Sequence, residues 1–177
     1  MIPRVNTARL CLRPFRPEDT APLYQILVQP GVLQYFPDPT PPSLERVERF
    51  IGKQLTQWQE RGYAWWAVQP LQTDRLAGWC GPQFLPETRE TEVGYLLGRE
   101  WWGQGYATEA AQASLDFTFQ QFPLDQIIAL VHPDNKASIR VIEKLGMKST
   151  GLAPYFGVEL ERFVLTRLAW QKQTKEK

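Results

Sequence analysis

Two glycines in a short turn, Gly103 and Gly105, have the types and spacing that suit a phosphate-binding loop. Before them an apolar run at residues 91–97 predicts a strand, and after them residues 107–122 predict a helix. The first N–H groups of a helix lack intrahelical partners and carry partial positive charge, so a helix start attracts an anion. Glycine permits positive φ and lets phosphate oxygens approach the backbone. The stretch therefore predicts a phosphate-bearing ligand held mainly by main-chain amides.

A plain connection is the alternative, because a strand-to-helix turn often needs glycine without any ligand. No Gly-Lys-Ser/Thr follows the turn, which excludes a Walker loop. The dinucleotide-binding fingerprint needs a third glycine at the position that Thr108 occupies. The elements around the loop therefore have to decide between the two interpretations.

Length and composition indicate one globular domain, residues 1–170, followed by a polar C-terminal tail at 171–177. The chain has 20 Lys and Arg residues and 19 Asp and Glu residues, so its net charge is close to zero. We therefore expect no overall electrostatic attraction to nucleic acid or to an anionic membrane. The two cysteines, Cys11 and Cys80, lie in different apolar segments, which favours reduced thiols over a bridge. Without a signal-like N-terminus or an apolar run of about 18 residues, we expect a cytoplasmic protein. No cluster has metal-ligand spacing, so we expect no metal.

Local patterns predict the elements that precede the loop. Apolar and polar residues alternate over 8–13, which predicts a strand. A helix is expected from Pro17, where proline precedes two acidic residues, and a second helix from its cap Ser43. Runs at 63–69 and 76–85 predict a hairpin that leads into the strand before the loop.

The pattern after the loop completes the fold prediction. A continuous apolar run at 126–131 predicts a buried strand, and residues 135–145 a short helix. Residues 147–150 and 161–170 predict two further strands. The order is strand, two helices, three strands in a meander, helix, strand, helix and two strands. It predicts an α/β fold with a mixed, mostly antiparallel sheet flanked by about four helices.

Exposed aromatic residues mark two further segments. A proline-rich link at 34–42 carries Tyr35 and Phe36 and is either a plain connection or the pre-ordered rim of a pocket. Tyr155 and Phe156 form a second pair that is a candidate wall of the same pocket.

Two stretches resemble the GNAT superfamily of acyl-CoA-dependent N-acetyltransferases. Residues 102–107, Trp-Gly-Gln-Gly-Tyr-Ala, are similar to its pyrophosphate loop, Arg/Gln-x-x-Gly-x-Gly/Ala. Asn135-x-x-Ser138, continued by residues 139–147, resembles its second motif. Together with Glu-Val-Gly-Tyr at 92–95, they most resemble the subgroup that includes enzymes acetylating N-termini of ribosomal proteins.

The resemblance implies acetyl-CoA as the co-substrate and a sheet whose central strands splay apart to admit its pantetheine arm. The diphosphate would lie on the loop amides, and the thioester beside residues 95–97, where an N–H can polarise its carbonyl oxygen. The implied cofactor-binding residues are Tyr95, Leu96, Leu97, Trp102, Gly103, Gln104, Gly105, Tyr106, Ala107, Asn135 and Ser138.

Two positions depart from the family pattern. Trp102 stands where many members have Arg or Gln, so we expect one polar contact to be lost while the amide cradle stays. Met147 stands where many members have Phe, which conserves volume.

Ser138 matches the family's Asn-x-x-Ser and is the candidate catalytic acid that protonates the departing thiolate. The alternative is a first-turn serine that bonds its own backbone. Asn135 suits both a helix N-cap and a cofactor contact. Tyr106 and Tyr155 are further acid candidates, or packing aromatics.

Glu92 is the first choice for the catalytic base, acting through a water, because carboxylates on this strand serve some members. A solvated or ion-paired strand residue is the alternative. The single histidine, His132, ends a buried strand and has a suitable unperturbed pKa of about 6.5, or is structural. Glu159 and Glu161 lie where some N-terminal acetyltransferases use a late glutamate.

Three basic residues on one predicted helix face are Lys136, Arg140 and Lys144, spaced at i, i+4 and i+8. They either attract the 3′-phosphate of the cofactor or form an ordinary solvated face.

The sequence thus predicts an N-acetyltransferase that moves an acetyl group from acetyl-CoA directly to a primary amine. A protein N-terminus, an aminoglycoside, a polyamine and an amino-acid-like metabolite stay open as acceptors, and so do the monomer and the homodimer. The rival is a non-catalytic acyl-CoA-binding or partner-binding module on the same fold.

Overall fold

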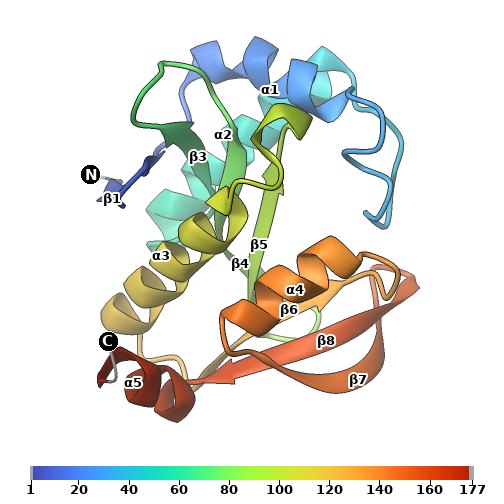
Figure 1. Cartoon of the computed structure of the whole chain (residues 1–177). Coiled ribbons are helices and arrows are strands. Elements are labelled where there is room, and N and C mark those ends of the chain that lie inside the picture. The colour runs from blue at the N-terminus through green and yellow to red at the C-terminus, as the bar shows by residue number, and fades with distance from the viewer. Residues whose placement is uncertain (1, 176–177) are drawn as a thin grey trace.

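The structure is a computed structural model, and it describes residues 2–175. The strands of this range are β1 (Val5–Asn6), β2 (Leu10–Arg13), β3 (Trp66–Pro70), β4 (Gly78–Leu85), β5 (Glu90–Leu97), β6 (Gln126–Val131), β7 (Lys148–Tyr155) and β8 (Val158–Thr166). They form one sheet in the order β1-β2-β3-β4-β5-β6-β8-β7 (Figure 1). Neighbouring strands are antiparallel, except that β5 and β6 are parallel. The predicted mixed, mostly antiparallel sheet is confirmed.

Helices cover both faces of the sheet. They are α1 (Thr20–Leu27), α2 (Leu44–Arg61), α3 (Tyr106–Gln121), α4 (Lys136–Lys144) and α5 (Arg167–Lys175), with 3-10 turns at Pro17–Asp19 and Arg99–Trp101. Leu23 of α1 and Val47 of α2 share a buried cluster with Trp79 of β4, whereas Leu115 of α3 and Ile142 of α4 share another with Leu97 of β5. The two faces of the central strands therefore serve two separate cores. No described helix combines the length and the apolar content that crossing a bilayer requires.

Helix boundaries follow local chemistry where the sequence supplies it. The Ser43 hydroxyl accepts a hydrogen bond from the Arg46 N–H at 3.2 Å, and α2 ends at Gly62 with φ of 78°. A serine cap and a left-handed glycine satisfy the helix-end groups without help from elsewhere in the fold. The predicted bounds of α2 are therefore confirmed, and those of β6 match residue for residue.

The C-terminal segment was predicted wrongly. Strand β8 ends at Thr166, and the helix α5 replaces both the end of the predicted strand 161–170 and the start of the frayed tail. The Arg167 guanidinium donates to three carbonyl oxygens around the end of α3, and Trp170 stacks on Phe119 at 5.2 Å between ring centroids. These tertiary contacts give the polar segment a packed helix, a fifth beside the four expected. Residues 176 and 177 of the predicted tail lie outside the described range.

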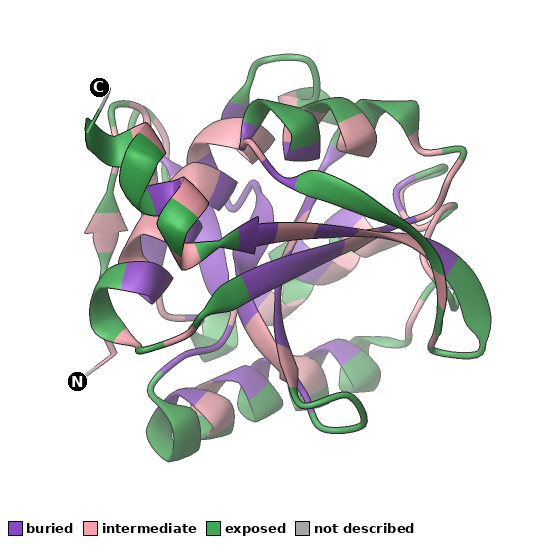
Figure 2. Ribbon diagram, turned by 90° about the horizontal axis from the view of Figure 1, so that it is seen from below, coloured by how far each residue is buried: buried purple, intermediate pink, exposed green. Residues whose placement is uncertain are grey.

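Further differences lie at the edges of the sheet. The two-residue strand β1 was not predicted, and β7 runs five residues past the predicted 147–150 to Tyr155. Figure 2 shows that the β7–β8 hairpin is largely exposed at its outer edge. A strand without a buried face does not need alternating apolar residues, so the sequence pattern does not predict it. Cys11 and Cys80 are both free thiols, and Cys80 is buried.

The sheet opens between its two parallel strands. Strands β4 and β5 are in register over eight residue pairs, whereas β5 and β6 are in register at one pair, Glu92 with Ile128. Figure 1 shows β5 and β6 diverging from this point, so that α3 and α4 lie on either side of the opening. This is the splayed central pair that the resemblance implied, and it places free backbone edges inside the molecule.

Candidate active site

A cavity of about 820 Å³ occupies the opening between β5 and β6. Its walls come from both diverging strands, from the loop before α3, from α4 and from the link between α1 and α2. It gathers Glu92 and all predicted cofactor residues except Gln104: Tyr95, Leu96, Leu97, Trp102, Gly103, Gly105, Tyr106, Ala107, Asn135 and Ser138. Segments that are more than 40 residues apart in the chain thus meet at one site.

The glycine loop presents an array of backbone donors to this cavity. Gly103 and Gly105 have φ of 72° and 79°, in the left-handed region that glycine adopts without strain. Helix α3 has no side-chain cap, and its first intrahelical bond is donated by Glu109. Within residues 2–175, the N–H groups of positions 103–108 donate to no protein acceptor. Such unpaired amides at a helix start form a site for an anion.

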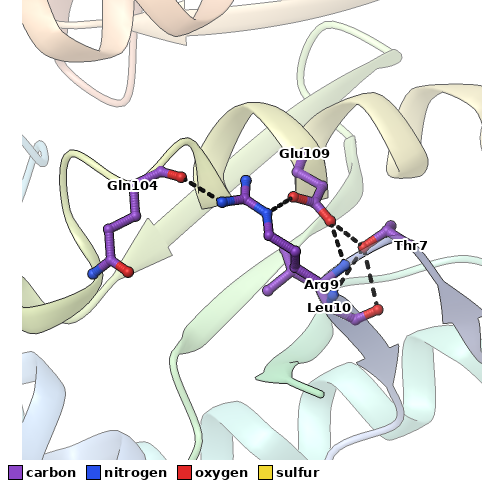
Figure 3. Close-up of polar contacts among 5 residues, drawn as sticks. All are labelled: Thr7, Arg9, Leu10, Gln104 and Glu109. Carbon is purple, nitrogen blue, oxygen red and sulfur yellow. Dashed lines mark hydrogen bonds and ion pairs between the residues drawn. The ribbon is translucent and has the colours of Figure 1, made fainter. Parts of the chain in front are cut away.

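An arginine from the bend between β1 and β2 holds the loop in place (Figure 3). Arg9 Nη1 donates to the Gln104 carbonyl oxygen at 2.8 Å, and Arg9 Nε contacts Glu109 Oε2 at 2.6 Å. The guanidinium also lies 4.7 Å from the centre of the Tyr106 ring. Thr7 Oγ1 donates to Glu109 Oε1 at 2.6 Å. Arg9 was not predicted as a functional residue. Its partner Glu109 lies 100 positions away in the chain, so no local pattern indicates the contact.

Electrostatics favour the ionised form of Glu109. Partial burial raises the pKa of this carboxyl, but hydrogen bonds from Thr7 and Arg9 outweigh that effect and hold the pKa below its usual value.

Gln104, the predicted residue outside the cavity wall, donates through its side-chain amide to the Glu100 carbonyl oxygen at 2.7 Å. Gln104 therefore contributes to the loop through its backbone groups, not through its side chain.

Trp102 makes a polar contact within the protein. Its indole N–H donates to the Leu97 carbonyl oxygen at 2.7 Å and so connects the loop to β5. Met147 is 2% exposed in the core, as volume conservation predicted.

Ser138 pairs with a tyrosine instead of its own backbone. Its hydroxyl oxygen lies 2.7 Å from the Tyr95 phenolic oxygen, and the Tyr95 hydroxyl also reaches the Ser138 carbonyl oxygen at 3.2 Å. Burial raises the pKa of Tyr95 above its usual value, the Ser138 hydrogen bond opposes this, and Cys80 adds to it. The phenol therefore stays protonated. Asn135 caps α4 as predicted, because its side-chain oxygen accepts from the Ser138 N–H at 3.1 Å.

Glu92 is buried in the cavity wall and is not ion-paired. It is 9% exposed, and no described side chain forms a hydrogen bond or ion pair with its carboxyl group. Burial raises its pKa to about 8, and the neighbouring Glu90 adds a smaller increase. Glu90 itself accepts from the Tyr155 hydroxyl at 2.6 Å and pairs with Arg162. The structure thus places an isolated carboxyl group with a near-neutral pKa in the cavity wall.

The other candidate bases are placed less well. His132 lines the cavity, but its Nδ1 accepts from the Asp134 N–H at 3.2 Å. This nitrogen is therefore already a hydrogen-bond acceptor within the protein. Glu161 accepts from Ser149 at 2.8 Å, and neither it nor the exposed Glu159 lines the cavity.

The remaining predicted residues divide between wall and surroundings. Tyr35 and Phe36 line the cavity, and the Tyr35 ring lies 5.4 Å from that of His132, so the link is a rim. Phe156 lines the cavity and Tyr155 does not. Arg140 and Lys144 also face the cavity, whereas the Lys136 ammonium donates to the Pro133 carbonyl oxygen at 2.7 Å.

Comparison with known proteins gives a family match over most of the chain. The model of an acetyltransferase (GNAT) domain matches residues 9–148. The uncharacterized protein YkkB of Bacillus subtilis (strain 168) is 35% identical over 152 residues, which cover 81% of this chain and 84% of that protein. The uncharacterized N-acetyltransferase p20 of Bacillus licheniformis is 33% identical over 148 residues, which cover 82% and 83%.

Solved structures share the fold over nearly the whole chain. An acetyltransferase from Agrobacterium tumefaciens str. C58 superimposes with a TM-score of 0.81 at 28% identity and covers 93% of this chain and 95% of its own. The ribosomal L7/L12 alpha-N-protein acetyltransferase RimL, solved in complex with coenzyme A, has a TM-score of 0.80 at 20% identity, over 94% and 99%. At that identity the second likeness concerns the fold alone.

Proposed function

Because this chain belongs to the GNAT acetyltransferase family, whose members transfer acetyl groups from acetyl-CoA to amines, we propose that its cavity binds acetyl-CoA for direct transfer to a primary amine. The protein is an acetyl-CoA-dependent acetyltransferase by its family model and its curated relatives. The cofactor enters on the α3–α4 face of the opening between β5 and β6, and the amine approaches from the α1–α2 face.

The unpaired amides of positions 103–108 are the observation that carries this proposal. They converge on the cavity at the start of α3, where a diphosphate gains both hydrogen bonds and the helix dipole. Arg140 and Lys144 face the same cavity from α4 and supply positive charge for the 3′-phosphate. One anionic, extended ligand satisfies all of these groups.

The backbone direction of β5 selects the residues that hold the pantetheine arm. The Gly98 N–H donates to the Ala77 carbonyl oxygen, on the side of β4. Backbone groups of successive strand residues point to alternate sides, so those of Leu97 and Tyr95 point into the opening. Leu96 points to β4, since its carbonyl oxygen would lie 2.0 Å from a Cβ at Gly78. The Leu97 carbonyl oxygen already accepts from the Trp102 indole N–H. The backbone groups of Tyr95 and the N–H of Leu97 are therefore the ones that pair with the arm and polarise the thioester.

The chemistry needs one base and one acid. The amine nitrogen attacks the thioester carbonyl carbon, the C–S bond breaks, and the amide forms. Glu92, in its ionised form, accepts the amine proton through a water. Ser138 donates the proton that the departing thiolate takes and regains a proton from solvent, with Tyr95 holding its hydroxyl in position. A tetrahedral oxyanion is stabilised by the backbone N–H groups of β5.

A binding experiment and a turnover experiment test the proposal. Isothermal titration with acetyl-CoA is expected to give a saturable signal that Gly105→Asp abolishes. An aspartate strains the left-handed backbone at this position, where φ is 79°, and its Cβ would lie 3.3 Å from Arg9 Nη2, so it disturbs the contact that holds the loop and adds negative charge near the diphosphate. Gly52→Asp is the matched control, since Gly52 lies on α2 with open space around its Cα. Thiol release with a panel of primary amines measures turnover. Equal affinity in Gly105→Asp and wild type would place the diphosphate elsewhere.

A further inference from the structure

The cavity continues past the thioester position to the α1–α2 face of the sheet, where its wall is aromatic. The indoles of Trp65 and Trp79 stack with ring centroids 3.9 Å apart and planes 16° apart. Phe36 meets Trp79 edge-on at 6.2 Å, and Phe50 supports Trp65 from behind at 5.6 Å. Such a wall offers a wide apolar surface of fixed geometry to a ligand.

Two glycines let this wall lie against the central strands. Gly81 of β4 and Gly94 of β5 are register partners. A Cβ at Gly94 would lie 3.3 Å from a ring carbon of Trp79 and 3.4 Å from Trp65 Nε1. The missing side chain therefore brings the Trp65 indole N–H close to β5, on the face that Glu92 shares two residues away.

Two buried polar atoms in the wall lack protein partners. Within residues 2–175, Trp65 Nε1 and Gln83 Oε1 are buried and make no hydrogen bond. Both residues line the cavity, and Gln83 is the register partner of Glu92 across β4 and β5. Buried donors and acceptors are almost always paired in native proteins, so unpaired ones that face a cavity point to a ligand that pairs them.

We propose that this part of the cavity is an acceptor subsite for α-amino carbonyl compounds with an aromatic side chain. The inference rests on the proposed acetyl transfer. The amine lies toward Glu92, its carbonyl oxygen accepts from Trp65 Nε1, and an N–H of the ligand donates to Gln83 Oε1. The aromatic side chain packs on the wall of Trp79 and Phe36.

The same groups disfavour two acceptors that the sequence left open. A polyamine has no oxygen that could accept a hydrogen bond from the Trp65 N–H, so this buried donor would stay unpaired. An aminoglycoside carries hydroxyl and ammonium groups around its whole surface, which an apolar wall leaves without partners. The shared chemistry that the subsite recognises occurs both in free amino-acid derivatives and at a peptide N-terminus that begins with an aromatic residue.

Three matched acceptors test separately whether the subsite recognises the aromatic ring and whether it recognises the carbonyl group. Phenylalaninamide carries ring and carbonyl, phenethylamine lacks the carbonyl group, and alaninamide lacks the ring. Thiol release at saturating acetyl-CoA is expected to give phenylalaninamide a kcat/KM at least about 10-fold above each of the other two. A peptide beginning with Phe is compared with phenylalaninamide to distinguish peptide N-termini from free amino-acid derivatives. The acceptor with the higher kcat/KM identifies the physiological class. The inference is overturned if the protein acetylates neither of them.

Substitutions assign the recognition to the named atoms. Trp65→Phe keeps a ring but removes the N–H, so it is expected to abolish the advantage of phenylalaninamide over phenethylamine and to keep the advantage over alaninamide. Gln83→Met is expected to lower kcat/KM for phenylalaninamide about 10-fold. Trp101→Phe is the matched control, because Trp101 also has a buried unpaired indole N–H, beside the cofactor loop. It is expected to leave the ratios among the acceptors unchanged.

The outcomes distinguish this inference from the proposed function. Loss of acetyl-CoA binding in wild type would overturn both. Acetyl-CoA binding with equal rates on all amines, or with full discrimination retained in Trp65→Phe, would overturn the acceptor subsite and leave acetyl transfer standing. An unchanged acetyl-CoA Kd in Trp65→Phe and Gln83→Met is required for any change in kcat/KM to count as acceptor recognition.

Discussion

The phenolic oxygen of Tyr95 lies 2.7 Å from the hydroxyl oxygen of Ser138, which connects β5 to the first turn of α4 across the cavity. Because burial keeps the phenol protonated, Tyr95 can donate this hydrogen bond and leave the Ser138 proton free. The pair is a neutral hydrogen-bonded proton donor in the cavity wall, which is the property that the proposed acid role of Ser138 requires.

Removal of that donor tests the acid role of Ser138. Ser138→Ala is expected to lower kcat about 100-fold, the lower range for a positioned general acid, and to change acetyl-CoA affinity much less. Tyr95→Phe keeps the ring and is expected to reduce kcat less, because it loosens the serine without removing its proton. Rapid-quench and titration measurements give the two constants. An unchanged kcat in Ser138→Ala would assign the proton to solvent.

The pH dependence of the rate tests Glu92. Its pKa of about 8 means that the carboxyl group is mostly protonated at neutral pH, so kcat/KM is expected to rise with pH through about 8. Glu92→Gln is expected to lower kcat/KM about 100-fold at pH 8.5 and to abolish this limb. If the rise of kcat/KM with pH persists in Glu92→Gln, it reports the deprotonation of the acceptor's own ammonium group, and Glu92 is not the base.

The same carboxyl group makes stability depend on pH. The folded pKa of about 8 exceeds the model-peptide value of 4.5, so the folded protein binds the extra proton between these values. The free energy of unfolding is therefore expected to fall as pH rises from about 4.5 to 8, and to fall less steeply in Glu92→Gln. Urea unfolding at pH 5, 6.5 and 8 measures the slope. Parallel slopes for the two proteins would contradict the burial of an uncompensated carboxyl group.

The contact of Arg9 with the glycine loop predicts a positioning role in cofactor binding. Arg9→Met removes the bonds to Glu109 and to the Gln104 carbonyl oxygen and is expected to weaken acetyl-CoA binding about 10-fold, with the acceptor KM unchanged. Glu109→Gln should weaken it less, and a double-mutant cycle measures their coupling. Arg49→Met, which disrupts an exposed pair on α2, is the control. Wild-type affinity in Arg9→Met would show that the loop holds its shape alone.

A buried ion pair near the N-terminus is expected to dominate local stability. The two terminal guanidinium nitrogens of Arg13 each lie 2.7 Å from the carboxylate of Asp19, which also accepts from the Arg16 N–H at 2.8 Å. Asp19→Ala leaves a buried guanidinium without a counter-charge and is expected to cost about 3–5 kcal/mol in chemical unfolding. Glu45→Ala, at an exposed pair, should cost less than about 0.5 kcal/mol. A loss below about 1 kcal/mol in Asp19→Ala would mean that water reaches Arg13.

Features with short-range causes could be predicted from the residue order. The glycine turn at Gly103 and Gly105, the Ser43 cap of α2 and the Asn135 cap of α4 each depend on groups within a few residues. Their chemistry limits the backbone regardless of what surrounds it. That is why the loop, the second motif and the mixed α/β order were recognisable before any packing was known.

Features that join distant segments were decided by tertiary structure alone. Arg9 meets Glu109 across 100 positions, and Trp65 lies beside Gly94 only because β3, β4 and β5 are in register. The raised pKa of Glu92 likewise comes from burial, which depends on every element packed around it. Residue types and spacing specify local backbone and candidate chemistry, whereas contacts, solvent exclusion and unpaired polar atoms exist only once the whole sheet has formed.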